Sequence, residues 1–436
     1  MQKISFGNKI LILGFGAVSK ATLQMLFKHI DISADSVEII SADTKENQKI
    51  AEKFGVRLTN EIITKENYKK LITERLTKGD LVVNLTAETS SLDIARLCLQ
   101  EEILYMDTCI ELWPDTGNST PKTTYALHQS FLQFKDEMAS FKTTSLSSHG
   151  ANPGVVSLLV KKCLVAIAKE NNHPLPDLNI PENWAELAIQ LGVTTIHINE
   201  RDTQTATDGD FSEYNFINTW SPQAMYVECT DPAEMVLGSH EALPEGATAC
   251  NEQLPRSIYF DKAAKDVSLE TWLPHTGYQT GYVVNHSEPI TIAKLLTSKE
   301  KNYNPRVGFV YHPCPDVVEC LKREGIDDEN FVLKGKVITS EITGGYDELG
   351  VLIETSKYGT YWLGSMLTIE QTREIDPTGS ATSLQVAGGV ISGICWIIQN
   401  PEKGVIETED MTDYESVLKT AEPYWGKFDF FKKPEN

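Results

Sequence analysis

The stretch KILILGFGAVSKATLQMLFKHI, residues 9–30, decides the fold of the first part of the chain. A short apolar run leads into Gly14, and apolar residues then recur at helical spacing. The turn reads G-x-G-x-x-S, which departs from the dinucleotide-binding pattern G-x-G-x-x-G only at Ser19. A strand, a tight turn and a helix in this order predict the start of a βαβ unit.

Outward from this stretch, short apolar runs alternate with helical segments. The run VEIISAD ends at Asp43, and further strands are predicted at 56–58, 81–86 and 103–108. Alternating β and α elements favour a parallel, doubly wound sheet through about residue 145. We therefore expect an α/β fold whose N-terminal domain is of the Rossmann type.

The residues of the glycine loop have the properties needed to bind a dinucleotide. Gly14 would make the turn, and Gly16 would let the backbone approach a pyrophosphate at the N-terminus of the helix. Ser19 is small enough for close packing of the helix on the strand. The acid at Asp43 would accept hydrogen bonds from a ribose 2′-OH and repel a 2′-phosphate, so NAD is favoured over NADP. The alternative is a turn that serves packing alone.

Beyond SSHGANPG, residues 147–154, the pattern changes. A long apolar helix, VVSLLVKKCLVAIAKE, precedes several β-like runs such as VTTIHI, VGFVYH and YGTYWLG. These predict an α+β substrate and dimerisation domain with a largely antiparallel sheet. The expected boundaries are 1–150 for the dinucleotide domain, 151–380 for the second domain, and 381–436 for C-terminal helices that return to the first domain.

Charge and composition limit the class of protein. The formal net charge is −22, from 39 basic and 61 acidic residues, which disfavours nucleic acid and anionic membranes as partners. The segment 191–250 holds ten acids and one base, Arg201. The apolar run VAGGVISGICWIIQ is predicted to be a buried helix, and the N-terminus lacks the features of a secretory signal, so we expect a cytoplasmic protein. Eight cysteines without a C-x-x-C pair predict free thiols and no metal site.

Several longer strings carry a resemblance. They are NLTAETSSLDIA (84–95), MDTCIELWP (106–114), SSHGANPG, HINERDTQ (197–204), NTWSPQAMYVE (218–228), GGYDELG (344–350) and ATSLQV (381–386). Together with the glycine loop they resemble the bacterial homospermidine synthases, a family of the saccharopine dehydrogenase-like group, over essentially the whole chain. The resemblance implies a homodimer in which bound NAD accepts a hydride from putrescine and later returns it, so that two putrescines become homospermidine and ammonia.

The resemblance also implies roles for individual residues. The dinucleotide would be held by Gly14, Gly16, Ala17, Val18 and Asp43, with its nicotinamide half lined by Asn84, Thr86 and Thr108. Asn152 would lie near the nicotinamide and the substrate. The diamine pocket would be formed by Glu88, Glu111, Glu200, Trp220, Glu228 and His286. Glu88 departs from the family pattern, which has Asp in that string, so the reach of this carboxylate differs.

The chemistry of a diamine agrees with these residue types. Putrescine is a dication at neutral pH, because alkylamines have pKa values near about 10.4. A pocket for a dicarboxylate would need arginines, yet from 151 to 300 the chain has only Arg201 and Arg256. A base must deprotonate the amine before hydride leaves, and Glu200, Glu228 and His286 are candidates that the sequence does not rank. Trp220 would attract the cationic imine through its indole face.

Each of these features has an alternative. A single acid is commonly a solvated surface charge, and a tryptophan is commonly part of a core. The string GGYDELG, taken by itself, predicts a hairpin turn with Asp347 and Glu348 exposed. At the level of function, the alternatives are a saccharopine or carboxynorspermidine dehydrogenase-like reductase and a non-catalytic NAD-sensing Rossmann protein.

Overall fold

The computed structural model describes residues 3–42, 47–87, 89–114, 123–206, 211–326 and 331–435. The chain forms two compact units, each built on its own large sheet. Unit 1 comprises Met1–Pro121, Ala126–Val155 and Leu384–Thr408. Unit 2 comprises Lys122–Tyr125, Val156–Ser383 and Glu409–Asn436.

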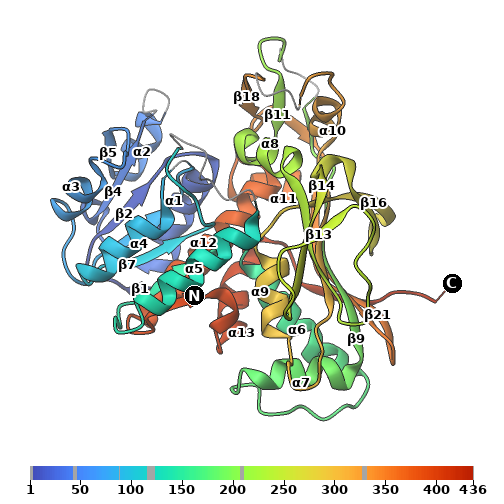
Figure 1. The fold of residues 1–436 in the computed structure, drawn as a ribbon. Coiled ribbons are helices and arrows are strands. Elements are labelled where there is room, and N and C mark those ends of the chain that lie inside the picture. The colour runs from blue at the N-terminus through green and yellow to red at the C-terminus, as the bar shows by residue number, and fades with distance from the viewer. Residues whose placement is uncertain are drawn as a thin grey trace. The chain divides into compact units, whose positions relative to one another are not determined.

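Unit 1 contains the predicted parallel sheet, which confirms the α/β doubly wound class. Its seven strands lead outward in both directions from β2, and every pair is parallel (Figure 1). Across the sheet they are β22 (Val405–Glu407), β8 (Ser145–Ser147), β7 (Leu104–Asp107), β6 (Leu81–Asn84), β2 (Ile10–Leu13), β4 (Val37–Ser41) and β5 (Arg57–Asn60). The order reverses between β2 and β6, which is where ligands bind in open α/β sheets.

Helices pack on both faces of this sheet. They are α1 (Ala17–His29), α2 (Gln48–Phe54), α3 (Tyr68–Thr73), α4 (Ser91–Gln100), α5 (Thr124–Glu137) and most of α12 (Ala381–Gln399). A small parallel pair, β1 (Ile4–Ser5) with β3 (Ile30–Asp31), flanks the start of the chain.

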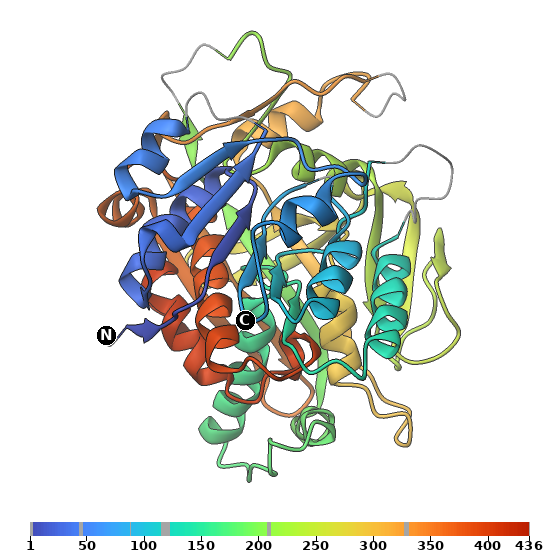
Figure 2. The ribbon, with the colours of Figure 1, turned by 90° about the vertical axis from the view of Figure 1, so that its left-hand side faces the viewer.

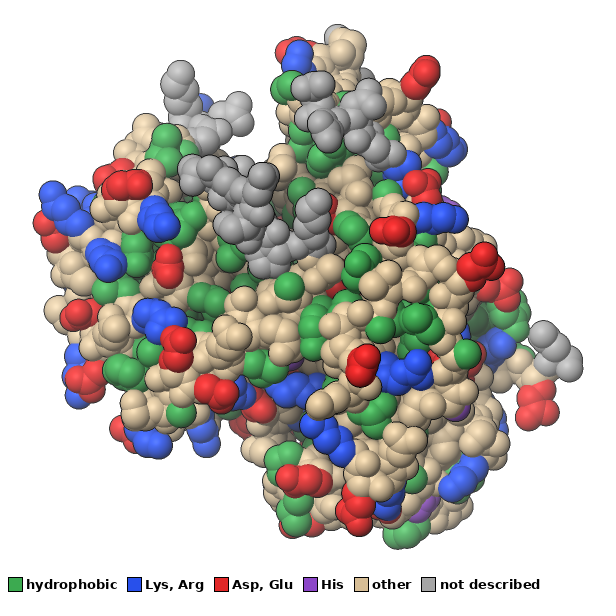
Figure 3. Space-filling model, viewed as in Figure 1, with side chains coloured by type: hydrophobic (Ala, Val, Ile, Leu, Met, Phe, Trp, Pro, Cys, Tyr) green, Lys and Arg blue, Asp and Glu red, His purple; other side chains and the backbone are tan. Residues whose placement is uncertain are grey.

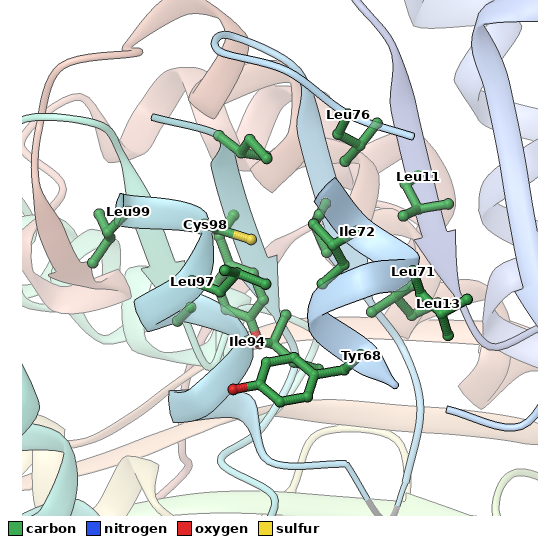
Figure 4. Packing of buried hydrophobic residues seen from close by; sticks show 14 of the residues in the cluster. Leu11, Leu13, Tyr68, Leu71, Ile72, Leu76, Ile94, Leu97, Cys98 and Leu99 are labelled. Atoms are coloured by element: carbon green, nitrogen blue, oxygen red, sulfur yellow. The ribbon is translucent and has the colours of Figure 1, made fainter. Parts of the chain in front are cut away.

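The core on one face lies between α3, α4, α5 and the sheet. Figure 4 shows Tyr68, Leu71 and Ile72 of α3 opposite residues of α4, with Leu11 and Leu13 of β2 beside them. Burying a leucine of this kind contributes about 1.5–3 kcal/mol. The helix α4 begins at a cap in which the Ser90 side chain accepts a hydrogen bond from the Asp93 N–H at 3.2 Å.

The opposite face is covered in part by α12, seen in orange-red beside the blue strands in Figure 2. A side chain at Gly393 would collide with His149 and with Met106 of β7, so glycine permits the close approach of this helix. The helix is long and apolar enough to span a membrane, but 89% of its apolar window is buried inside the protein. The prediction of a buried helix is therefore confirmed.

Unit 2 is built on a mixed, mostly antiparallel sheet of ten strands, as predicted. The central pair, β9 (Val193–Asp202) and β17 (Arg306–His312), is parallel, and its other pairs are antiparallel. The others are β13 (Ala247–Ala249), β14 (Arg256–Ala263), β12 (Pro232–Leu237), β20 (Tyr346–Thr355), β21 (Gly359–Thr368), β23 (Asp429–Lys432), β15 (Ser268–Leu273) and β16 (Gly277–Val284).

Helices and two small strand pairs complete unit 2. The predicted helix after the SSHGANPG string is α6, over Val155–Glu170. The remaining helices are α7 (Glu182–Leu191), α8 (Pro222–Thr230), α9 (Glu288–Leu295), α10 (Pro315–Leu321), α11 (Ile369–Ile375) and α13 (Tyr414–Ala421). The small pairs join β10 (Thr205–Ala206) to β19 (Ile342–Gly344) and β11 (Phe216–Asn218) to β18 (Gly335–Val337).

The acidic excess does not gather into one surface patch on the face shown in Figure 3. There, acidic and basic side chains are interspersed. Part of the negative charge is instead buried, because these carboxylates of unit 2 are less than 5% exposed: Glu200, Asp202, Glu234, Glu288, Asp347, Glu348 and Asp376. Buried ionised carboxylates are costly unless they are paired or hydrogen-bonded. The partners of the buried acids in unit 2 must therefore be identified.

Candidate active site

The glycine loop of unit 1 has the geometry of a dinucleotide cradle. Gly14 follows β2 with φ of +88°, and a Cβ there would lie 2.8 Å from the Leu85 carbonyl oxygen. Only glycine fits this position without strain. Gly16 precedes α1, and a Cβ added there would meet nothing within 4 Å. The start of α1 has no side-chain cap, which leaves the first N–H groups of the helix, including those of Ala17 and Val18, directed at this space.

Ser19 substitutes for the third glycine of the pattern. Its side chain is buried against the loop, and its hydroxyl donates a hydrogen bond to the Gly14 carbonyl oxygen at 2.8 Å. The serine therefore ties the first turn of the helix to the loop while remaining small.

The residues predicted to line the nicotinamide half lie at the ends of neighbouring strands. Asn84 ends β6 and is buried, and its side-chain oxygen accepts a hydrogen bond from the Thr86 hydroxyl at 2.7 Å. The loop after β6 contacts the glycine loop, since a Cβ on Gly14 would also lie 3.0 Å from the Thr86 methyl group. Thr108 follows β7, and its methyl group lies 3.4 Å from the Cβ position of Gly150.

Two predicted residues of unit 1 lie outside the described residues, namely Asp43 and Glu88. Asn152 is partly buried in the segment that follows β8. Glu111 is partly buried beyond β7, where its N–H donates to the Ser91 hydroxyl at 2.9 Å and its carboxylate accepts a hydrogen bond from the Cys109 thiol at 3.4 Å. The structure thus places Glu111 in unit 1, whereas the predicted acids Glu200 and Glu228 belong to unit 2.

In unit 2, three buried carboxylates share one face of the central sheet. Glu200 and Asp202 are two residues apart on β9 and therefore point to the same side. Asp347 of β20 pairs directly with Asp202 and adds a third carboxylate to that side. We call Glu200, Asp202 and Asp347 the acid cluster. Only Glu200 was predicted, because the other two are brought there by strand register.

The acid cluster cannot be fully ionised at low cost. Burial, together with the charges of Glu200 and Asp202, holds the pKa of Asp347 well above its ordinary value. Burial also raises the pKa of Asp202 to about 6, although hydrogen bonds from Thr219 and Gln204 oppose the shift. A cation bound here would favour ionisation of these groups.

His286 lies between two carboxylates. Its Nε2 is 3.2 Å from Glu228 Oε1, and its Nδ1 is 3.0 Å from Glu288 Oε2. Burial alone would lower the pKa of His286, but the charges of Glu288 and Glu228 outweigh it and hold the pKa well above its ordinary value. The imidazole is therefore an imidazolium at neutral pH. The predicted pair Glu228 and His286 is brought together, and Glu288 is a partner that the sequence reasoning missed.

Two aromatic rings of β17 link the histidine to the acid cluster. The His286 ring lies 4.8 Å from that of Phe309, which stacks on Tyr311 at 5.5 Å. Tyr311 pairs with Glu200 across β17 and β9, so it faces the same side. Its hydroxyl is buried and has no hydrogen-bond partner in the described part of the chain. Histidine, rings and acids thus form one buried strip along unit 2.

Trp220 is adjacent in sequence to Thr219, which contacts the acid cluster. It is partly buried and follows Thr219, whose hydroxyl donates to Asp202 Oδ2 at 2.7 Å. The segment is fixed further by α8, which begins with Ser221 as its cap. The described contacts attach the neighbours of Trp220 to the acid cluster.

The hairpin prediction for GGYDELG is wrong. Asp347 and Glu348 are fully buried in the ten-residue strand β20 rather than exposed in a turn. Glu348 points to the opposite face from Asp347 and accepts hydrogen bonds from the N–H groups of His275 and Thr276 at 2.9 and 3.1 Å. The apolar run GVLIET after the two acids indicates a strand and would have predicted their burial.

A surface pocket of about 480 Å³ lies elsewhere in unit 2. Three of its nine lining residues are the cations Lys265, Lys322 and Arg323, against two acids, Asp266 and Glu324. This composition does not suit a diamine. Among the described residues there is no group of three His, Cys, Asp or Glu side chains that could hold a metal ion.

Comparisons with known proteins define the class first. Residues 10–146 match the family model described as the saccharopine dehydrogenase NADP binding domain, and residues 150–429 match the saccharopine dehydrogenase C-terminal domain. A saccharopine dehydrogenase from Saccharomyces cerevisiae shares the fold, with a TM-score of 0.57 at 11% identity, over 98% of this chain and 100% of that one.

More similar relatives narrow the class. A homospermidine synthase of Blastochloris viridis is 35% identical over 96% of this chain and 89% of its own length, and one of Mesorhizobium japonicum is 32% identical over 96% and 88%. A crystal structure of the Legionella pneumophila homospermidine synthase in complex with NAD superposes with a TM-score of 0.91 at 35% identity, over 99% of this chain and 92% of that one. The chain belongs to the homospermidine synthases of the saccharopine dehydrogenase family.

Proposed function

We propose that this protein converts two molecules of putrescine into homospermidine and ammonia, with NAD as a hydride carrier that is regenerated within each cycle. The observation that carries the proposal is the strip of buried carboxylates in unit 2. A dicationic diamine is the kind of ligand that offsets such charges, whereas a dicarboxylate would need arginines there. The similarity to two homospermidine synthases over nearly the whole chain supports the same conclusion.

The residues of unit 1 fit a dinucleotide. Gly14, Gly16, Ala17 and Val18 would hold the pyrophosphate, and Asn84, Thr86 and Thr108 would line the nicotinamide half, with Asn152 near it. NAD supplies a nicotinamide that takes a hydride from the first amine and returns it to the later imine, so net redox is zero. The choice of NAD over NADP rests on the sequence position of Asp43 and on the cofactor of the Legionella structure.

The amine must lose a proton before hydride leaves its carbon, because an ammonium has no lone pair to stabilise the developing cation. Two features of unit 2 favour Glu228 over His286 as the acceptor. His286 is already protonated, because its two carboxylate neighbours stabilise the imidazolium. Glu228 Oε2 is buried and has no hydrogen-bond partner in the described residues, so it is open to an ammonium N–H.

The remaining steps are assigned to the same strip. The first amine becomes an imine, the second putrescine adds through its free amine, and the nitrogen of the first amine leaves as ammonia after taking a proton from the acid that received one earlier. Glu200 and its neighbours in the acid cluster would bind the far ammonium group. Trp220 would retain the cationic imine, and Glu88 and Glu111 are proposed to contact the diamine.

Product analysis tests the proposal. Incubation with putrescine and a catalytic amount of NAD should give many turnovers of homospermidine by mass spectrometry, with about one ammonia released per product. Absorbance of reduced nicotinamide should show no steady net change. Consumption of cofactor in proportion to product would contradict hydride carriage and indicate a reductase, while NAD binding without turnover would indicate a sensor.

Two further properties are proposed, the oligomeric state from the family resemblance and the location from the sequence. The protein is expected to be a homodimer, and light scattering should give a mass of about twice the 48.6 kDa of one chain. It is also expected to act in the cytoplasm, where cell fractionation should recover it.

A further inference from the structure

A chain of hydrogen bonds crosses the ends of three neighbouring strands in unit 1. Asn84 of β6 pairs directly with Asp107 of β7, and Ser147 ends the next strand, β8. Tyr105 lies two residues before Asp107 and points to the same side of the sheet. All four side chains are buried, with 1–4% exposure. We call Thr86, Asn84, Tyr105, Asp107 and Ser147 the strand-edge network.

The bonds of the network have a fixed direction. The Asp107 carboxylate accepts from the Ser148 N–H at 2.7 Å and the Ser147 hydroxyl at 3.2 Å. It is also hydrogen-bonded to the Tyr105 hydroxyl. A phenol has one proton, so while it donates to Asp107 it accepts from the Asn84 amide N–H, which lies 3.3 Å away.

This direction sets the orientation of the Asn84 amide. With its N–H₂ group toward Tyr105, the amide oxygen faces Thr86 and accepts from the Thr86 hydroxyl at 2.7 Å and from its N–H at 3.3 Å. Thr86 in turn lies against Gly14 of the dinucleotide loop. The proton on Tyr105 is therefore coupled to the wall of the proposed cofactor site.

We propose that Asp107 is a positioning residue that, while ionised, holds Thr86 in the shape required by NAD through Tyr105 and Asn84. The proposal rests on NAD binding by unit 1. A protonated Asp107 would donate to the Tyr105 oxygen, and the Tyr105 proton would then face the Asn84 N–H₂ group. The amide would have to rotate to accept it, and the Thr86 hydroxyl and N–H would lose the Asn84 oxygen as their acceptor. The Thr86 hydroxyl would then turn to the Thr89 hydroxyl, which lies 2.5 Å away.

The surroundings of Asp107 support a change of charge near neutral pH. Burial raises the pKa of Asp107 to about 7, against the opposing hydrogen bonds from Ser148, Tyr105 and Ser147. On the loop after β7, Glu111 adds to this rise, and Cys109 stays neutral because burial holds its thiol pKa well above the ordinary value.

Other titratable groups near the network come from β8, β22 and α5. His149 is neutral, because burial lowers its pKa to about 4. Glu407 of β22 pairs with Ser147 in the sheet and binds His128 of α5 at 2.7 Å. Since the pKa of Asp107 is raised, the ionised form and its effect on Thr86 should be fully present above pH 8 and decline as pH falls through 7.

The experiment measures the dissociation constant of NAD from the intact protein between pH 6 and 8. The wild-type protein should bind NAD about fivefold more weakly at pH 6, the effect of one lost hydrogen-bond contact. Asp107→Asn keeps the volume but donates to Tyr105 as the protonated acid would, so it should bind at the weak level at every pH. Tyr105→Phe breaks the coupling and should also remove the pH dependence.

Tyr68→Phe is the matched control, since it removes a hydroxyl from the same core without touching the network, and it should keep the wild-type pH profile. If Asp107→Asn does not fold, Tyr105→Phe carries the test. An NAD affinity with the wild-type pH dependence in Tyr105→Phe or Asp107→Asn, even with a lower melting temperature, would overturn the positioning role. A wild-type protein that binds no NAD would instead contradict the proposed function.

Discussion

The strand edge of unit 1 and the acid strip of unit 2 satisfy their polar groups in opposite ways. Around Asn84 and Asp107 the buried polar atoms are bonded to one another, and the open groups are backbone N–H donors at the start of α1. In unit 2, Glu228 Oε2 and the Tyr311 hydroxyl are buried without a partner in the described residues. We propose that the open N–H donors of the first region bind an anionic pyrophosphate. The second region has unpartnered polar atoms that could accept hydrogen bonds from a cationic amine.

The largest expected effect concerns two histidine–glutamate pairs, His286–Glu288 in unit 2 and His128–Glu407 in unit 1. Glu288→Gln would leave the largely buried His286 imidazolium with Glu228 as its one described carboxylate partner. Breaking a buried pair from one side costs about 3–5 kcal/mol, and urea denaturation should show a loss of this size. Because His286 and Glu228 belong to the proposed amine site, kcat/KM for putrescine should fall as well.

The matched control is Glu407→Gln, which breaks the pair with His128 in unit 1. It should also lower stability, but KM for putrescine should stay unchanged in the folded protein. Equal effects of the two variants on KM would show that the loss is one of folding and would remove the His286 pair from the amine site.

The second effect concerns NAD affinity and tests whether the space next to Gly16 in unit 1 holds the dinucleotide. Gly16→Ala adds a methyl group where the protein itself has nothing within 4 Å, so the melting temperature should not fall. If a pyrophosphate occupies that space, crowding it costs about 1–3 kcal/mol, or roughly 5- to 150-fold in the dissociation constant of NAD.

Gly7→Ala is the control for this change, because a Cβ at Gly7 also meets nothing within 4 Å and Gly7 lies before β2, away from the loop. It should bind NAD as the wild type does. Unchanged NAD affinity in Gly16→Ala would show that the dinucleotide does not approach this backbone.

The two regions also differ in how far they could be predicted. The glycine loop is local: a strand, Gly14 and a helix within about twenty residues specify both its shape and its place in a parallel sheet. The helix α6 was likewise predicted from its own apolar pattern. Local patterns therefore predicted the α/β class and the proposed cofactor loop.

The acid strip depends on pairing between distant segments. Asp347 joins Asp202 only through the register of β20 on β9, and nothing in the string GGYDELG specifies that register. Glu288 joins His286 at the start of α9, and the two-residue spacing alone does not show that Glu288 is fully buried and His286 only 10% exposed. The carboxylates missed from the sequence are those whose burial is set by tertiary packing.

The third effect concerns Trp220, which the sequence assigns to retention of a cation. If the indole contributes about 2 kcal/mol in a desolvated site, Trp220→Ala should lower kcat/KM roughly thirtyfold, and Trp220→Phe should keep much of the activity. A tryptophan that only packs would instead lose about 3–5 kcal/mol of stability on truncation, with activity falling only as the folded fraction falls. Melting temperature and kinetics on the same preparations separate the two roles.

The smallest effect is the pH dependence of putrescine binding, which tests whether the acid cluster binds the cationic amine. Since the pKa of Asp202 is raised to about 6, the unliganded protein carries a proton there at pH 5 and little of it at pH 7. Its contribution to folding stability is therefore lost as pH rises through 6, whereas putrescine, a dication throughout this range, prefers the ionised carboxylate. The dissociation constant of putrescine should be about tenfold higher at pH 5 than at pH 7, and the thermal stabilisation by putrescine should be larger at pH 7.

Two variants locate the group responsible for this slope. Asp202→Asn should bind putrescine more weakly than the wild type and without the pH dependence. Glu234→Gln is the control, because burial raises the pKa of Glu234 to about 7, but its carboxylate accepts hydrogen bonds from the N–H groups of Thr124 and Tyr125 and lies outside the acid cluster. The slope should therefore persist in Glu234→Gln. A slope that disappears in Glu234→Gln and survives in Asp202→Asn would mean that the amine binds away from the acid cluster.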